Sequence, residues 1–260
     1  MGTAHPVATH VRPHAAPGAS TLAVTGRVLR QLRHDPRTIA LLLVVPSLLL
    51  ALMDALWTEQ PQVFNRVGLV MLAIFPFVVM FLVTSIAMLR ERTSGTLERL
   101  LTTPLPRPAL LLGYGAGFGL AAALQAAVTT AVGFGLLGLQ TAGPLGWVVL
   151  IAMVDAVLGV ALGLLCSAFA RSEFQAVQFM PVVVLPQVFL CGLLVPRGQM
   201  AGWLQAISDV LPLTYAVDAL QEVGSHPAAT GRMWVDLAVV GGAALLALGL
   251  AAATLRRRTS

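Results

Sequence analysis

The chain has 260 residues, of which 57% are hydrophobic and only 10% are charged, and its formal net charge is +5. The mean hydropathy of +0.85 lies far above that of a soluble domain, so the composition excludes an ordinary soluble protein and predicts a polytopic membrane protein. All 16 basic residues are Arg. Because a Walker A loop needs a Lys, the sequence also excludes a P-loop ATPase.

Residues 1–19 are rich in His, Pro and Ala and lack the apolar core of a secretory signal. We expect them to form a disordered cytoplasmic tail. Three histidines, His5, His10 and His14, lie in this stretch, but a Pro-rich tail gives them no fixed geometry for a metal ion. The sequence therefore predicts no metal site.

Residues 20–34 have the pattern of an amphipathic helix that ends at Asp35-Pro36. At about 100° per residue, one arc is apolar and the opposite arc is basic. The apolar arc holds Leu22, Val24, Val28, Leu29 and Leu32, and the basic arc holds Arg27, Arg30 and Arg33. The pattern predicts an interfacial helix lying flat on the inner leaflet. A helix packed on a cytoplasmic partner protein would show the same pattern.

Six apolar runs reach the length of about 20 residues that a membrane-spanning helix requires. They cover residues 38–57, 67–89, 109–139, 145–170, 174–195 and 233–255. Glycines in the third and fourth runs, Gly113, Gly115, Gly117, Gly119, Gly159 and Gly163, predict small-residue surfaces where helices approach closely. We therefore expect an all-α polytopic membrane protein with six transmembrane helices in one domain over residues 20–260.

The arginines divide unequally between the two sides of this topology. One side holds Arg12, Arg27, Arg30, Arg33, Arg37, Arg90, Arg92, Arg99, Arg107, Arg171, Arg256, Arg257 and Arg258, and the other holds only Arg66, Arg197 and Arg232. The positive-inside rule then predicts that both termini are cytoplasmic. The Lys-free composition is typical of a G+C-rich bacterial genome, so we expect the cytoplasmic membrane of a bacterium. Topology and contact with anionic membrane lipid explain the pI near 10.5, so we expect no nucleic-acid partner.

Asp155 lies near the middle of the fourth expected span, where an ionisable group is costly and faces protein or water. It could form part of a substrate path with Gln125 and Gln178, or hydrogen-bond to one of them as a structural pair. The sequence leaves both readings open. Cys166 and Cys191 are expected at depths about 20 Å apart, which excludes a disulfide between them.

Two short amphipathic pieces, residues 199–208 and 213–223, lie between the last two expected spans. They are too short to cross a bilayer, and such lengths are typical of re-entrant or interfacial helices. The alternative is an extracellular helical hairpin that rests on the membrane.

A charged island, Arg90-Glu91-Arg92-Thr93-Ser94-Gly95-Thr96-Leu97-Glu98-Arg99, separates the second and third expected spans and leads to Pro104. Ser94 or Gly95 can cap a helix start, and Glu98 then falls in the first turn, where the helix dipole favours an acid. Because Pro104 stops the helix, the island predicts a short cytoplasmic helix of about two turns.

The island resembles the coupling segment of the ABC-2 family of ABC-transporter permeases, an R-E-x-x-x-G-T-L-E-x-L-x-x-x-P run between the second and third spans. The run LPLTYAVDAL at residues 211–220 resembles the same family's signature before the last span, here with Pro212, Thr214, Tyr215 and Asp218 in the re-entrant region. The resemblance covers the chain from Ser20 onward. It is nearest to the small drug and antibiotic exporters, since no large extracellular domain interrupts the sequence.

The resemblance implies a permease that pairs with a second copy or a paralogue and sits on two cytoplasmic ABC ATPase subunits. Those subunits bind ATP and Mg, and this chain itself binds no cofactor. Arg90 to Arg99 are then the ATPase-coupling residues, with the short helix after Gly95 docked in a cleft of the ATPase. The implied cargo is a hydrophobic drug, an antibiotic or a lipid-like molecule.

The main alternative is an ion-coupled secondary transporter of a small molecule, which would use intramembrane charges and repeated halves. This sequence has one mid-span acid and no evident internal repeat, and that alternative leaves the charged island unexplained. A membrane-embedded enzyme is not expected, since neither H-E-x-x-H nor G-x-S-x-G occurs.

Overall fold

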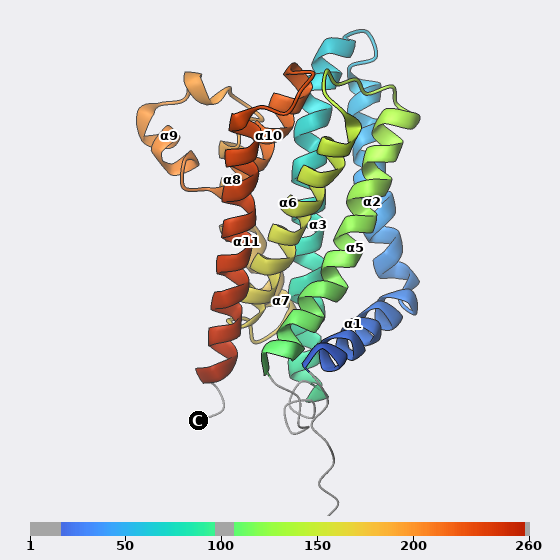
Figure 1. The fold of residues 1–260 in the computed structure, drawn as a ribbon, viewed down its shortest axis with the longest axis vertical. Coiled ribbons are helices and arrows are strands. Elements are labelled where there is room, and N and C mark those ends of the chain that lie inside the picture. Colours follow the sequence, from blue (N-terminus) through green and yellow to red (C-terminus); the bar gives the residue numbers. More distant parts are fainter. Residues whose placement is uncertain (1–16, 97–106, 258–260) are drawn as a thin grey trace, which may run out of the picture.

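The structure, a computed structural model, describes residues 17–96 and 107–257, and this part of the chain is helical with short connections (Figure 1). Six helical segments are long and apolar enough to cross a membrane, which confirms the all-α polytopic fold. They are α2 (Pro36–Leu56), α3 (Pro61–Thr93), α5 (Arg107–Gly135), α6 (Leu145–Ser167), α7 with α8 (Glu173–Val183 and Leu185–Leu190) and α11 (Gly231–Arg257).

Several expected spans differ from the observed helices in their bounds: α3 is longer at both ends than the expected 67–89, α6 ends three residues before 170, and α8 ends five residues before 195. Two spans also differ in course. The third was expected to reach residue 139, but α5 ends at Gly135 and the chain turns through Gly138, whose φ of +69° suits glycine. Leu139 then packs back into the bundle with 3% of its surface exposed. The fifth was expected to be continuous, but it breaks at Val184 between Pro181 and Pro186, because proline cannot supply the N–H that a helix interior needs.

Helices α3 and α6 form the centre of the bundle and pack at backbone contact. A Cβ added to Gly159 would lie 2.4 Å from the carbonyl oxygen of Phe77, and one added to Gly163 would lie 2.6 Å from that of Phe81. Only glycine permits this approach, which confirms the predicted small-residue surface on the fourth span. The long buried side chains of α3, among them Phe77 and Phe81, fill the space on either side.

Helix α1 (Pro17–Arg33) crosses the lower part of α5 (Figure 1). It begins at Pro17, so the tail expected over residues 1–19 is too long by three residues, while residues 1–16 lie outside the described part. Val24 and Val28 are buried, and Cβ atoms added to Gly113 and Gly117 would lie 2.5 and 2.7 Å from their Cβ atoms. The glycines of α5 therefore receive α1, although Leu22 stays exposed at 73%.

A 3-10 turn η1 (Arg197–Gln199), α9 (Gly202–Ser208) and α10 (Pro212–Ser225) lie between α8 and α11. Helix α10 is packed among α3, α6 and α11, and its apolar residues Leu213, Ala216, Val217, Ala219 and Leu220 are fully buried. Two short helices therefore occupy the expected positions, and α10 is a component of the bundle. Cys166 and Cys191 are buried and free, as expected.

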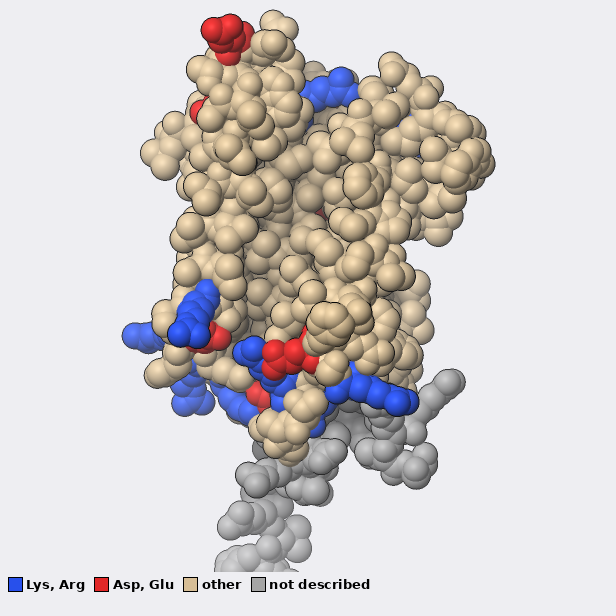
Figure 2. All heavy atoms as spheres, turned by 180° about the vertical axis from the view of Figure 1, so that it is seen from behind, with Lys and Arg blue, Asp and Glu red and all other residues tan. Residues whose placement is uncertain are grey.

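The two ends of the bundle differ in charge. We call the basic end the one at which α1 lies, with Arg27, Arg30, Arg33, Arg37, Arg90, Arg92 and Arg171 of the described residues. Figure 2 shows blue side chains gathered there. The opposite end carries Arg66, Arg197 and Arg232, which line one polar cavity. The described chain begins in α1 and ends in α11 near the same, basic end (Figure 1).

Candidate functional site

The charged island begins in the last turn of α3, at the basic end. Ser94 is the C-cap of α3, because its backbone N–H donates to the carbonyl oxygen of Arg90 at 2.9 Å. Gly95 follows with a φ of +70°, a left-handed conformation that glycine adopts readily after a helix. The Ser94 hydroxyl is 2.9 Å from that of Thr96. Sequence reasoning assigned Ser94 or Gly95 to a helix start, and the structure shows that they also end α3.

Glu91, one turn before this C-cap, is buried and holds α1. Its side chain is 7% exposed, and both carboxylate oxygens accept hydrogen bonds from Nη2 of Arg27 at 3.0 and 2.8 Å. Arg27 was placed on the solvent-facing arc of the amphipathic helix, but its guanidinium turns inward to this acid. The pair connects the amphipathic helix α1 to the first turn of the island.

Arg90 forms a second ion pair on the neighbouring face of α3. Its Nε and Nη2 atoms donate to the two carboxylate oxygens of Glu173 in α7 at 2.8 and 3.1 Å, the forked geometry that a guanidinium favours. Both side chains are more than half exposed. The last turn of α3 is thus tied to α1 on one side and to α7 on the other.

The remaining island residues divide into described and undescribed ones. Thr93 bonds back to the carbonyl oxygen of Leu89 at 3.2 Å, and Arg92 is partly buried. Leu97, Glu98 and Arg99 lie outside the described residues, so the expected coupling helix stays a prediction.

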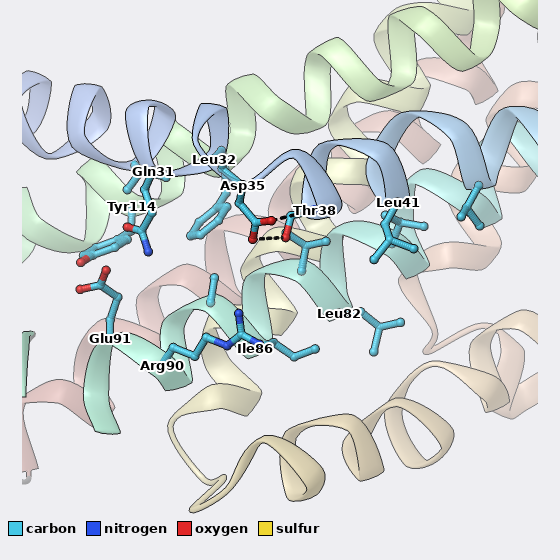
Figure 3. A pocket seen from close by; sticks show the side chains of 16 residues that line it. Gln31, Leu32, Asp35, Thr38, Leu41, Leu82, Ile86, Arg90, Glu91 and Tyr114 are labelled. Carbon is cyan, nitrogen blue, oxygen red and sulfur yellow. Dashed lines mark hydrogen bonds between the residues drawn. The ribbon is translucent and has the colours of Figure 1, made fainter. Parts of the chain in front are cut away.

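A cavity of 380 Å³ lies directly beside this junction, lined by residues of α1, α2, α3 and α5 (Figure 3). This is the volume range of sites for drug-sized ligands. Its walls are mainly apolar, and Tyr114 and Phe118 of α5 are its most buried aromatic residues. The apolar lining comprises Val28, Leu32, Leu41, Val45, Val79, Leu82, Val83, Ile86, Ala87 and Phe118.

Polar groups gather at one end of the cavity, where α1 turns into α2. Asp35 is the N-cap of α2, and its carboxylate accepts hydrogen bonds from the Thr38 hydroxyl at 2.6 Å and from the Thr38 backbone N–H at 3.1 Å (Figure 3). These bonds lower the pKa of Asp35 below its ordinary value. Arg90 of α3 lies on the side of the cavity that faces Asp35, and Glu91 lies farther along α3, where the Tyr114 hydroxyl points toward it (Figure 3). The cavity therefore has an apolar length and an acidic, hydrogen-bonding end.

The three residues expected to form a substrate path do not hydrogen-bond to one another in the described part of the chain. Asp155 in α6 and Gln125 in α5 are fully buried, and their side-chain polar atoms have no hydrogen-bond partner among the described residues. Gln178 is exposed on α7. The suggestion that Asp155 hydrogen-bonds to Gln125 or Gln178 is therefore wrong.

The residues expected in the re-entrant region hold the hairpin of η1 and α9 to the bundle. Pro212 starts α10, the hydroxyls of Thr214 and Ser208 lie 3.2 Å apart, and the Tyr215 hydroxyl donates to the carbonyl oxygen of Asp209 at 2.7 Å. Thr214 and Tyr215 therefore act as structural residues that join α10 to the end of α9. The depth of these helices in a bilayer stays a prediction.

Asp218 of α10 belongs to an ion-pair network at the opposite end. Its carboxylate accepts a hydrogen bond from Arg197, which also bonds to Asp209, and it lies 3.6 Å from Nη2 of Arg232. Burial raises the pKa of the Asp218 carboxyl above its ordinary value, and the two arginines act in the opposite direction. Arg197 thus links η1 to both α9 and α10.

Sequence reasoning missed the cavity and both ion pairs of the basic end. Arg27 and Glu91 are 64 residues apart, and Arg90 and Glu173 are 83 apart, so no local pattern joins them. One signal was present: Glu91 is an acid that follows a long apolar run, a position where a partner arginine is expected once the helix end is buried.

One family and several known proteins are similar to this chain. The family of ABC-2 type transporters matches residues 19–223. "Probable multidrug ABC transporter permease YbhR" of Escherichia coli K12 is 26% identical over 167 residues, which make up 64% of this chain and 45% of that protein. "Daunorubicin resistance ABC transporter permease protein DrrB1" of Streptomyces coeruleorubidus is 28% identical over 223 residues, 82% of this chain and 77% of that protein.

"Nodulation protein J" of Rhizobium meliloti is 29% identical over 139 residues, 52% of this chain and 51% of that protein. The matched part of this chain thus spans about half the length of the Escherichia coli and Rhizobium relatives, and more than three quarters of the Streptomyces relative.

Proposed function

Because this chain belongs to the family of ABC-2 type transporters, we propose that it is the transmembrane permease subunit of an ABC exporter. In this proposal two cytoplasmic ATPase subunits bind ATP and Mg, and a second permease copy or paralogue completes the transport path. The cargo is a hydrophobic drug, an antibiotic or a lipid-like molecule. The names of a multidrug permease and a daunorubicin resistance permease among the relatives support this class of cargo.

The observation that carries the proposal is the junction at the end of α3. The segment expected to couple to the ATPase begins with Arg90 and Glu91, and these two residues hold α7 and α1 through ion pairs. A displacement of the segment by the ATPase would therefore be transmitted to three helices at once. The same junction borders the apolar cavity. A displacement of the end of α3 by the ATPase would therefore change the shape of a cavity that has the size of a ligand site.

The proposal is tested at Glu98, in the expected coupling helix. An acid in the first turn of a helix contributes about 0.3 to 1 kcal/mol, too little to decide whether six spans fold. We expect Glu98→Ala to insert normally in the membrane, but to lose ATP-dependent transport of daunorubicin in vesicles that also contain the ATPase. Glu59→Ala, an exposed acid between α2 and α3 at the opposite end, is the matched control. Wild-type transport by the Glu98 variant would contradict the coupling role.

The orientation is tested separately, by cysteine labelling. Ser94 lies at the basic end, and Ser225 ends α10 at the opposite end. With the basic end in the cytoplasm, an impermeant thiol reagent added to intact bacteria should label Ser225→Cys and leave Ser94→Cys unlabelled until the cells are opened. Labelling of both positions in intact cells would contradict the proposed topology.

One observation favours an ion-coupled secondary transporter as the second candidate function. Asp155 is fully buried at mid-span without a hydrogen-bond partner among described residues, and such an acid is a functional candidate by default. Transport driven by an ion gradient without ATP, and lost in Asp155→Asn, would support that function. Transport that needs ATP would support the exporter.

A further inference from the structure

We propose that the cavity between α1, α2, α3 and α5 binds an amphiphile with a protonated amine head, held beside Asp35. This inference rests on the proposed function, because it names a class of cargo for it and a place where that cargo is bound. It concerns the chain by itself, however, and its test needs neither ATP nor an ATPase.

The shape of the cavity supports an elongated ligand. Its α3 wall runs from Val79 to Glu91, and 12 residues of helix rise about 18 Å. The polar side chains lie toward one end of the cavity. Toward the opposite end, only apolar side chains of α2 and α3 line it, among them Leu41 and Leu82 (Figure 3). An apolar chain or ring system with one polar head fits this division. A compact polar solute would leave most of the walls without a complementary partner.

The charges at the polar end favour a cationic head. Arg27 is paired with Glu91, and Arg90 is paired with Glu173, so each arginine already has a carboxylate. Asp35 has hydrogen bonds from Thr38, but no described arginine lies within ion-pair distance of it, and Arg90 acts on it only from farther away. Asp35 is therefore the acid of this group without a direct counter-ion. A carboxylate has about four lone-pair sites, so Asp35 can still accept hydrogen bonds from an ammonium besides those from Thr38.

An anionic head fits less well. The Arg90 guanidinium uses Nε and Nη2 for Glu173 and keeps Nη1 for a further acceptor, but an anion bound there would share Arg90 with Glu173 and would face the Asp35 carboxylate. The other arginines of α1, Arg30 and Arg33, do not line the cavity. In the proposed orientation, the negative potential of the inner leaflet also concentrates cationic amphiphiles at the depth of this end. Both effects act in favour of an amine.

The way in lies between α2 and α3. Leu41 of α2 lines the cavity and is still 58% exposed, while Leu82 of α3 on the other wall is half-buried. Of the α2 residues, only Leu42, Pro46 and Leu50 are buried. An amphiphile already dissolved in the leaflet can therefore reach the cavity sideways, without passing through the water phase.

The test uses the purified chain in nanodiscs of phosphatidylcholine, a lipid without net charge, so that the lipid itself does not select the probe. The probes are a dodecylamine carrying a diazirine on its chain, and the alcohol and sulfate with the same chain and the same diazirine. After irradiation, labelled positions are mapped by mass spectrometry, and half-saturation is measured by titration. We expect the amine to label lining residues of α2 and α3 and to saturate at about tenfold lower concentration than the alcohol, as a charge-assisted hydrogen bond provides.

Two variants with controls make the test specific. Val83→Trp fills the apolar part and should raise the half-saturation of amine and alcohol alike by about tenfold or more. Leu48→Trp, on an exposed face of α2 outside the cavity, is its control and should change neither. Asp35→Asn keeps an N-cap residue of equal quality, so it should remove the preference for the amine and leave the alcohol unaffected.

Three outcomes would overturn the proposal. The first is that the amine and the alcohol reach half-saturation at the same concentration, and the second is that the sulfate binds more tightly than the amine. The third is that labelling is spread over lipid-facing positions and does not change in Val83→Trp. A failure here would leave the ATP-dependent transport tested at Glu98 untouched, and a failure of that transport would not alter this binding.

Discussion

At the basic end, two ion pairs each join helices that are far apart in the sequence, Arg27 to Glu91 and Arg90 to Glu173. At the opposite end, Arg197 joins two aspartates that follow it within 21 residues, Asp209 and Asp218. The chemistry of the two ends is the same, but the surroundings differ. The opposite network rests on α10, whose apolar side chains are buried in the bundle, whereas the span of α7 and α8 is only 17% buried.

The difference indicates separate roles for the two ends. An ion pair beside a tightly packed helix has little freedom to move, so the opposite network should contribute chiefly to stability. The pair of Arg90 and Glu173 reaches the sparsely packed α7, and such a pair can break or re-form while the bundle stays folded. This pair should therefore contribute chiefly to the transmission of movement, as its position at the start of the proposed coupling segment also indicates.

The largest effect on stability is expected from Arg197→Ala at the opposite end. The change leaves the carboxylate of Asp218, 15% exposed, with only the longer contact to Arg232. Removing one partner of a buried pair costs about 3 to 5 kcal/mol, and partial exposure of Arg197 reduces this to roughly 2 kcal/mol. The free energy of unfolding, measured by denaturant titration in detergent micelles, should fall by that amount.

Arg66→Ala is the control for this measurement. Arg66 lines the same polar cavity and is exposed, and the described residues include no ion-pair partner for it. Its loss should change the unfolding free energy by less than about 0.5 kcal/mol. Equal effects of the two substitutions would show that general charge at this end, and not the Arg197 network, stabilises the hairpin of η1 and α9.

The sequence predicts the helices of this molecule better than it predicts their neighbours. The six spans follow from apolar runs, because few other structures can hold about 20 consecutive apolar residues. The break at Val184 does not follow, since membrane helices often tolerate a proline such as Pro181. Similarly, Gly113 and Gly117 indicate a close approach of helices, but not that α1 is the helix that approaches.

The candidate site is also predictable only in part, because local patterns are visible in the sequence and contacts between distant segments are not. The charged island stands out because it interrupts apolar sequence, and its ion-pair partners do not, because Arg27 and Glu173 look like ordinary helix-end charges. The cavity depends on how four helices diverge, which no periodicity encodes. Asp155 was recognised as unusual, but which groups surround it depends on the rotation of α5 and α6 about their axes.

A smaller effect is expected at the basic end, for the pair of Arg27 and Glu91. A double-mutant cycle with Arg27→Ala and Glu91→Ala should give a coupling of about 1 kcal/mol, because Glu91 is buried while Arg27 is one third exposed and can be hydrated. In either single variant, the rate of ATP-dependent transport per folded molecule should fall, while most of the free energy of unfolding is retained. A large loss of stability with normal transport per folded molecule would break the proposed contrast between the two ends.

The smallest effect is expected for the pair of Arg90 and Glu173. Their side chains are 57% and 53% exposed, and exposed pairs contribute about 0.2 to 1 kcal/mol, less as salt screens them. A double-mutant cycle on the purified chain should therefore give a coupling below about 0.5 kcal/mol at physiological salt. If the ATPase covers this end of α3, water is excluded from the same pair, and the coupling measured in the assembled complex should be larger than in the chain alone. An identical, small value in both states would place the ATPase contact away from the last turn of α3, and the coupling segment would then act without the support of α7.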